Sequence, residues 1–202
     1  MAVVPAIRHD QPEPVVAWTE SRIAELLAST TFRDDLVCPN CTHLGFEADL
    51  LVVHRSLRLI DVEIKISRAD LKADIDKDKW WRRPYWGYSE QRPDKVRLDW
   101  PRNVWKHYYA MPEAVWKPEL ADVIPATSGV MLICADQPIP EWGGPTHTVR
   151  HVRRARPNRD AEPVQPHTAI RIARLVSLRY WAARSAGRLS DLEGEDVRVV
   201  DG

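Results

Sequence analysis

The chain has 202 residues, and its 29 Lys plus Arg balance 29 Asp plus Glu, so the formal net charge is zero. This length predicts one domain, the balanced charge excludes a histone-like polycation, and a composition of 44% hydrophobic and 29% charged residues excludes a disordered chain. No apolar run reaches the roughly 18 residues of a membrane span and the N-terminus lacks a signal-peptide core, so we expect a cytoplasmic protein without membrane contact.

The N-terminal part predicts a flexible arm followed by a helix. Residues 1–14 hold three prolines without periodicity, which is typical of a loose segment. Residues 15–29 have helical spacing, with one apolar stripe formed by Val16, Ile23, Ala24 and Leu27. Glu20 falls on the same stripe, where a carboxylate is costly unless something pairs with it.

Two strands are predicted next, at residues 46–53 and 57–66. The short connection between them indicates an antiparallel hairpin. The second strand alternates strictly, with apolar residues on one face and Asp61, Glu63 and Lys65 on the other. Three charged side chains are therefore expected in a row on one side of a sheet.

A second helix is predicted to begin after Ser67, which is placed as an N-cap with Asp70 three residues on, and to run to about residue 80. A loop rich in Pro, Arg and aromatic residues follows at 80–103. Further strands and a last helix are predicted at residues 104–111, 128–134, 146–152 and 167–186. We expect residues 15–187 to form one α/β domain with a mixed central β-sheet flanked by helices, followed by an acidic tail at 188–202.

The chemistry-bearing pattern joins the two hairpin strands. Asp49 lies on the first strand, and Glu63 and Lys65 share a face of the second. Neighbouring strands lie about 4.8 Å apart, so the two carboxylates can converge on a hard cation such as Mg²⁺. Lys65 can orient or deprotonate an attacking water and offset negative charge that develops on a phosphate. The pattern predicts hydrolysis of a phosphodiester.

This arrangement resembles the PD-(D/E)XK nuclease superfamily. The run from Glu63 to Leu71, with Asp74, is similar to the EIK-x-SR-x-D-F-x-x-D signature of the MmcB-like branch and of related phage-encoded nucleases, with Leu71 in place of Phe. Residues 107–113 are similar to the strand and Pro-Glu element that follows in those proteins, and residues 178–181 resemble part of their terminal helix. Ala48 stands where the nominal motif has Pro.

The resemblance implies a restriction-endonuclease-like core and a nuclease that needs Mg²⁺ or Mn²⁺ and acts on DNA in repair, recombination or phage DNA processing. It implies Asp49, Glu63 and the carbonyl of Ile64 as metal ligands, Lys65 as a catalytic residue, and Glu20 as the group that completes the site. Glu47, two residues before Asp49, is another acidic candidate.

Two basic segments predict contacts with DNA, because cations meet phosphates and aromatic rings stack on bases. The residues expected to bind nucleic acid are Arg82, Arg83, Arg150, Arg153, Arg154 and Arg156. Trp80 and Trp105, at the ends of the aromatic loop, are expected to cap the core instead.

Other charged and metal-binding residue types have two interpretations each. Asp61 is expected either to face solvent or to contact the metal ligands without binding the metal itself. Asp74, Lys77 and Lys79 are either ordinary surface charges or residues that lie near the active site or the DNA. The Cys38–Cys41 pair has no second ligand pair, so an ordinary segment before the first strand is favoured over a zinc site.

The alternative function is a catalytically inactive nucleic-acid-binding or protein-interaction module on the same fold. A small zinc-binding regulator built around Cys38 and Cys41 is a third hypothesis. The sequence leaves a homodimer open, since cutting both DNA strands at one place favours two active sites.

Overall fold

The computed structural model describes residues 18–74, 76–82, 94–135 and 147–195. The arm predicted at residues 1–14 and the predicted DNA contact Arg83 lie outside these ranges. Within them, the expected α/β architecture with a mixed central sheet and flanking helices is confirmed.

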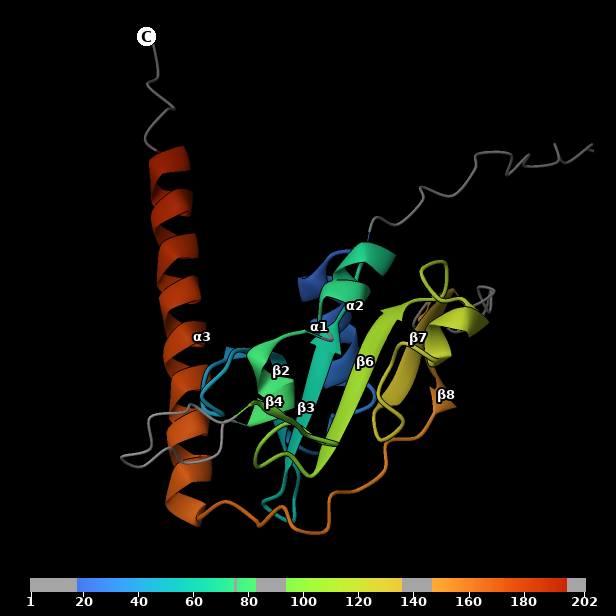
Figure 1. Ribbon diagram of the computed structural model, residues 1–202. Coiled ribbons are helices and arrows are strands. Elements are labelled where there is room, and N and C mark those ends of the chain that lie inside the picture. The colour runs from blue at the N-terminus through green and yellow to red at the C-terminus, as the bar shows by residue number, and fades with distance from the viewer. Residues whose placement is uncertain (1–17, 75, 83–93, 136–146, 196–202) are drawn as a thin grey trace, which may run out of the picture.

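The central sheet has six strands, in the spatial order β1-β2-β3-β6-β7-β8 (Figure 1). β3 and β6 pair in parallel, as do β6 and β7, whereas the other neighbours are antiparallel. The strands are β1 (Leu36–Cys41), β2 (Ala48–Val53), β3 (Leu59–Ile64), β6 (Lys106–Pro112), β7 (Gly129–Ala135) and β8 (His147–Arg153). The predicted β2–β3 hairpin is confirmed, and its register sets Leu50 opposite Val62.

β1 was not predicted as a strand, because Pro39 interrupts it. Proline lacks the N–H that a central strand must donate, so it is confined to sheet edges, and β1 is an edge strand. Cys38 and Cys41 are buried free thiols on this strand. They pack among apolar side chains that include Ile172.

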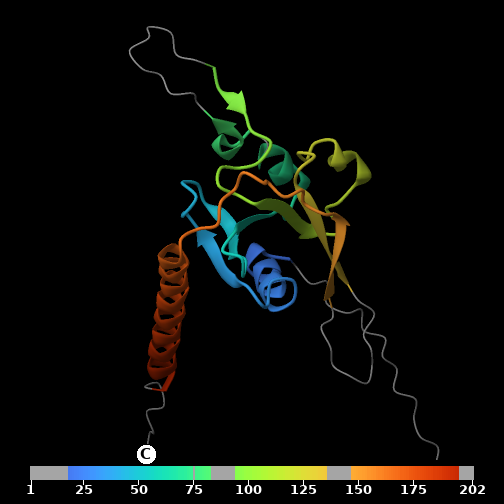
Figure 2. The same ribbon diagram turned by 90° about the horizontal axis from the view of Figure 1, so that it is seen from below.

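Helices cover both faces of the sheet, and Figure 2 shows α1 (Glu20–Ser29) on the side opposite α2 (Arg68–Asp74). Of the predicted apolar stripe, Ile23, Ala24 and Leu27 pack on the β2–β3 hairpin, and Val16 lies outside the described residues. The helix begins at Glu20 after the Thr19 cap and not at residue 15, and Glu20 is exposed instead of lying on the apolar face. On the other face, α2, the 3₁₀ helix η1 (Asp78–Trp80) and a second 3₁₀ helix η2 (Pro118–Ala121) cover β6 and β7. The long helix α3 (Pro166–Glu195) packs on β1 and β2.

The segment after β3 differs from the prediction. The Ser67 cap is confirmed, because its Oγ accepts a hydrogen bond from Asp70 N at 3.2 Å. The helix predicted to reach residue 80 ends at Asp74, however, and η1 follows separately. The loop predicted at 80–103 contains a two-stranded sheet of β4 (Trp81–Arg82) and β5 (Val96–Arg97). Trp80 caps the core as expected and is completely buried.

Candidate active site

The β2–β3 register brings Asp49 and Glu63 together. Because Leu50 lies opposite Val62, the next pair along the hairpin is Asp49 and Glu63. The Ile64 N–H donates to the side chain of Asp49, at Oδ2, over a distance of 2.8 Å, in place of a carbonyl of the neighbouring strand. The same oxygen lies 3.6 Å from Lys65 Nζ. The three residues predicted from the motif are thus adjacent in space.

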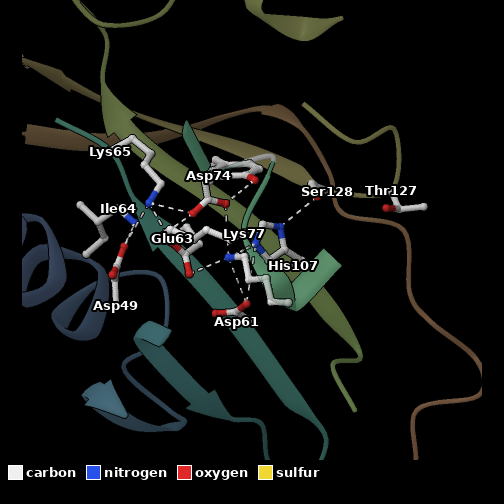
Figure 3. Close-up of polar contacts among 12 residues, drawn as sticks. Asp49, Asp61, Glu63, Ile64, Lys65, Asp74, Lys77, His107, Thr127 and Ser128 are labelled. Carbon is white, nitrogen blue, oxygen red and sulfur yellow. Dashed lines mark hydrogen bonds and ion pairs between the residues drawn. The ribbon is translucent and has the colours of Figure 1, made fainter. Parts of the chain in front are cut away.

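Glu63 is buried among lysines from three positions of the chain (Figure 3). Its Oε2 lies 2.7 Å from Lys65 Nζ and 3.4 Å from Lys77 Nζ, and its Oε1 lies 2.6 Å from Lys79 Nζ. Lys65 and Lys79 are each only 2% exposed at the side chain, whereas Lys77 is 48% exposed. Lys77 is therefore the lysine of this group that solvent reaches most readily.

Asp74 is a second buried carboxylate that contacts the same lysines. Its oxygens lie 3.3 Å from Lys65 Nζ, 2.7 Å from Lys77 Nζ and 3.4 Å from Lys79 Nζ. Tyr109 OH donates a further hydrogen bond to Asp74 Oδ2 at 2.7 Å. The interpretation of Asp74 and Lys79 as plain surface charges is wrong, because α2 and η1 bury them against the sheet, whereas Lys77, between the two elements, is half exposed and pairs with Glu63 and Asp74.

Asp61, His107 and Ser128 lie behind these groups. Asp61 is completely buried, with Oδ2 3.8 Å from Lys79 Nζ and 3.7 Å from His107 Nε2, both beyond hydrogen-bond length. His107 Nδ1 and Ser128 Oγ are 2.9 Å apart. Asp61 is thus not solvated and stands behind the motif carboxylates. His107 and Tyr109 were not predicted as neighbours of the site, although alternation along β6 places them on one face.

The electrostatics of the group favour a further positive charge near Asp49. Burial and then the Glu63 carboxylate raise the pKa of Asp49 to about 6. Burial acts to raise the pKa of Asp74, but Lys79 and Lys65 hold it well below its usual range. Burial makes ionisation of His107 unfavourable and places its pKa well below the ordinary value, so the imidazole is neutral. Burial also raises the pKa of Asp61 to about 7, against the opposing effect of Lys79, so this side chain is only partly ionised at neutral pH.

Asp49 opens onto a pocket of about 60 Å³ that Glu20 and Ile64 also line. Ser21, Ala24, Pro39 and Asn40 complete the lining. Glu20, at the start of α1, thus lies beside the motif as the sequence predicted, whereas Glu47 is exposed ahead of β2 and does not line this pocket.

The oxygen donors at this pocket fit a hard divalent cation. Mg²⁺ typically takes one or two carboxylates and keeps water for its other positions. Asp49 Oδ2 accepts the hydrogen bond from Ile64 N and lies 3.6 Å from Lys65 Nζ, so Oδ1 is the oxygen available to a cation. Among the described residues, no group of three or more His, Cys, Asp or Glu side chains is arranged to hold a metal. An ion here would therefore depend on few protein ligands and on water.

The predicted DNA-contacting arginines have separate environments. Arg150 forms an ion pair with Glu113 at the surface. Arg153 donates to backbone carbonyls before β7, at 2.8 Å to Ser128 O and 2.9 Å to Pro125 O. The remaining three described arginines are exposed, namely Arg82, Arg154 and Arg156. Arg153 is thus engaged in holding the fold.

Comparison with known proteins assigns no family. No family model matches the chain, and no curated protein matches it. Among solved structures it is similar to the SPO1766 protein of unknown function from Silicibacter pomeroyi, with a TM-score of 0.44, 16% identity, and coverage of 93% of this chain and 100% of that one. No helix among the described residues has both the length and the apolar character needed to cross a bilayer.

Proposed function

We propose that the chain is a metal-dependent deoxyribonuclease of the PD-(D/E)XK type, with a restriction-endonuclease-like core, that hydrolyses DNA phosphodiester bonds in repair, recombination or phage DNA processing. One observation carries the proposal. Asp49 and Glu63 lie opposite each other at the end of the β2–β3 hairpin, with the Lys65 ammonium 3.6 Å and 2.7 Å from them and with Glu20 lining the adjoining pocket.

The residues that would hold Mg²⁺ or Mn²⁺ are Asp49, Glu63 and the carbonyl of Ile64, with Glu20 beside them. When bound, such an ion polarises a phosphoryl oxygen and lowers the pKa of water. Asp49 and Glu20 are the carboxylates that line the pocket, and an ion bound there would place positive charge beside them.

Lys65 supplies a cation that is held in place before the reaction begins. Burial lowers the pKa of an ammonium group, but Glu63 and Asp74 outweigh this for Lys65 and raise its pKa, so it stays charged. A buried charge is screened little by water, and it is therefore effective against negative charge that develops on phosphate oxygens. The more exposed Lys77, 2.7 Å from Asp74 Oδ1, offers a second cation at the surface of the same group.

A second candidate function is a non-catalytic nucleic-acid-binding module on this fold. It is favoured by the complete pairing of Glu63 and Asp74, each of which contacts Lys65, Lys77 and Lys79. Lysines beside both carboxylates offset their buried charge without a metal.

Cleavage of labelled linear, nicked, single-stranded and branched DNA with Mg²⁺, Mn²⁺ or EDTA tests the proposal. The first variant is Asp49→Asn, because this side chain is 23% exposed and its replacement disturbs the fold least. Glu47→Gln is the matched control, an exposed acid two residues away. We expect metal-dependent cleavage that Asp49→Asn lowers by about 100-fold or more and that the control retains.

Lys65→Ala separates catalysis from binding. We expect turnover to fall much more than DNA affinity, because this cation acts on charge that develops in the transition state. Equal losses of turnover and affinity would contradict the role of Lys65. If the folded wild-type protein binds DNA but cuts no substrate with either metal, the nuclease proposal is rejected in favour of the non-catalytic module.

A further inference from the structure

Most of α3 is basic within a chain of zero net charge, and its three acidic residues, Asp191, Glu193 and Glu195, lie in its last five positions. Residues 163–190 contain five arginines and neither Asp nor Glu. The arginines are Arg171, Arg174, Arg179, Arg184 and Arg188. A one-signed stretch of this length produces a positive potential that attracts polyanions.

The face of α3 that points away from the sheet carries apolar side chains as well as arginines. Ile172 is buried on the β1 side of the helix, with Leu175 and Val176 partly buried beside it. At about 100° per residue, the opposite side of the helix presents one stripe. That stripe contains the exposed side chains of Ile170, Arg174, Leu178 and Trp181.

The aromatic residues on this helix are placed to stack with a ligand. Trp181 is 54% exposed, and the neighbouring Tyr180 is 56% exposed. Their rings contact each other edge-on at 5.2 Å between centroids, which leaves much of both rings at the surface. Aromatic rings beside arginines are the usual surface for unstacked bases, because the rings take the bases and the cations take the phosphates.

The mixture of arginines, aromatic rings and apolar side chains on α3 favours nucleic acid over the other partners that an exposed helix can bind. Over the arginine-bearing residues 171–188, a second copy of α3 side by side would bring arginines against arginines, and like charges destabilise such a contact. A helix that lies on a membrane keeps its cations and apolar residues on separate faces, whereas here Arg174 lies between Ile170 and Trp181. Interleaved cations and rings fit a single nucleic-acid strand.

α3 is attached beside the candidate active site through the side of the helix opposite this surface. The Arg179 guanidinium donates to the carbonyls of Pro39 and Asn40, the latter at 3.1 Å. These two residues line the pocket onto which Asp49 opens. From this attachment the helix continues past the end of β3 and stands clear of the sheet (Figures 1 and 2).

We propose that α3 is a nucleic-acid-binding arm that holds a single-stranded segment beside the β2–β3 site, through Arg174, Arg184 and the rings of Tyr180 and Trp181. The identity of that segment as the DNA substrate rests on the proposed nuclease function. The arm would favour unpaired or splayed DNA over an intact duplex, since paired bases cannot stack on Trp181.

Fluorescence anisotropy with labelled single-stranded and duplex DNA of equal length, in EDTA and over a range of salt, tests the arm without cleavage. The full chain is compared with an Arg174→Ala/Arg184→Ala double variant and with Trp181→Ala. The matched control is Arg33→Ala/Lys117→Ala, which removes two exposed cations elsewhere on the surface. These substitutions alter exposed side chains, and thermal unfolding verifies that each variant is folded.

We expect the arginine variant to reduce the dependence of log affinity on log salt for single strands by about 1.4, because each lost phosphate contact contributes about 0.7. Trp181→Ala should weaken single-strand binding about fivefold or more and change duplex binding less. Losses no larger than in the control would overturn the proposal, as would α3-dependent binding to phosphatidylserine vesicles in place of DNA.

The cleavage assay keeps the two proposals separable. If the protein cleaves DNA with metal but its affinity for single strands does not depend on α3, the arm is rejected and the nuclease is retained. Binding that depends on α3, without cleavage in either metal, would reject the nuclease and retain the arm.

Discussion

Replacement of Tyr109 by Phe measures how firmly the buried charge group is held. The change removes the hydrogen bond of 2.7 Å from Tyr109 OH to Asp74 Oδ2 and keeps the ring in its completely buried position. A hydrogen bond to a charged group contributes about 1.5–3 kcal/mol. Asp74 keeps its three lysine partners, so its carboxylate is not left without counter-charge. We expect the free energy of unfolding to fall by about 2 kcal/mol.

Equilibrium unfolding in urea gives this quantity directly. With a urea slope of about 2 kcal/mol per molar, the midpoint should fall by about 1 M. Tyr180→Phe is the matched control, because that ring is 56% exposed, and it should change stability by less than about 0.5 kcal/mol. A Tyr109→Phe midpoint within about 0.25 M of wild type would refute the assignment of the phenol as a support of Asp74.

Two further predictions concern the protonation of Asp49 and the arginines at the end of β8. Because burial raises the pKa of Asp49 from 3.8 to about 6, the fold favours its protonated form, so stability in EDTA should fall as pH rises from about 4 to 6. Asp49→Asn should flatten this fall in urea unfolding across that range, and an unchanged pH profile would contradict the assignment. Arg153→Ala should lower stability by about 1–3 kcal/mol, since its guanidinium bonds backbone carbonyls, whereas the exposed Arg154→Ala should cost less than about 0.5 kcal/mol. Equal changes in melting temperature in the two variants would show that Arg153 does not stabilise the segment before β7 that contains Pro125 and Ser128.

Short-range patterns in the sequence were sufficient to predict the motif side of the site. Alternation along residues 57–66 put Asp61, Glu63 and Lys65 on one face, and the short turn before them required the antiparallel pairing that brings Asp49 opposite Glu63. The Ser67 cap followed from residues three positions apart. Each of these inferences depends on neighbours along the chain, where strand and helix geometry restrict the conformations.

Tertiary structure decided where β1 lies and which charges are buried. Pro39 argues against a strand unless the strand is known to form a sheet edge, and that is a property of the assembled sheet. Lys79 and Asp74 belong to residue types that are almost never fully buried unless they are paired. Their partners lie on β3, α2, η1 and β6, and Tyr109 is 35 positions after Asp74 along the chain. The sequence alone therefore determined the strand pair that carries the motif, whereas the buried charge group depends on folding, because only folding brings enough opposite charge together to offset the loss of water.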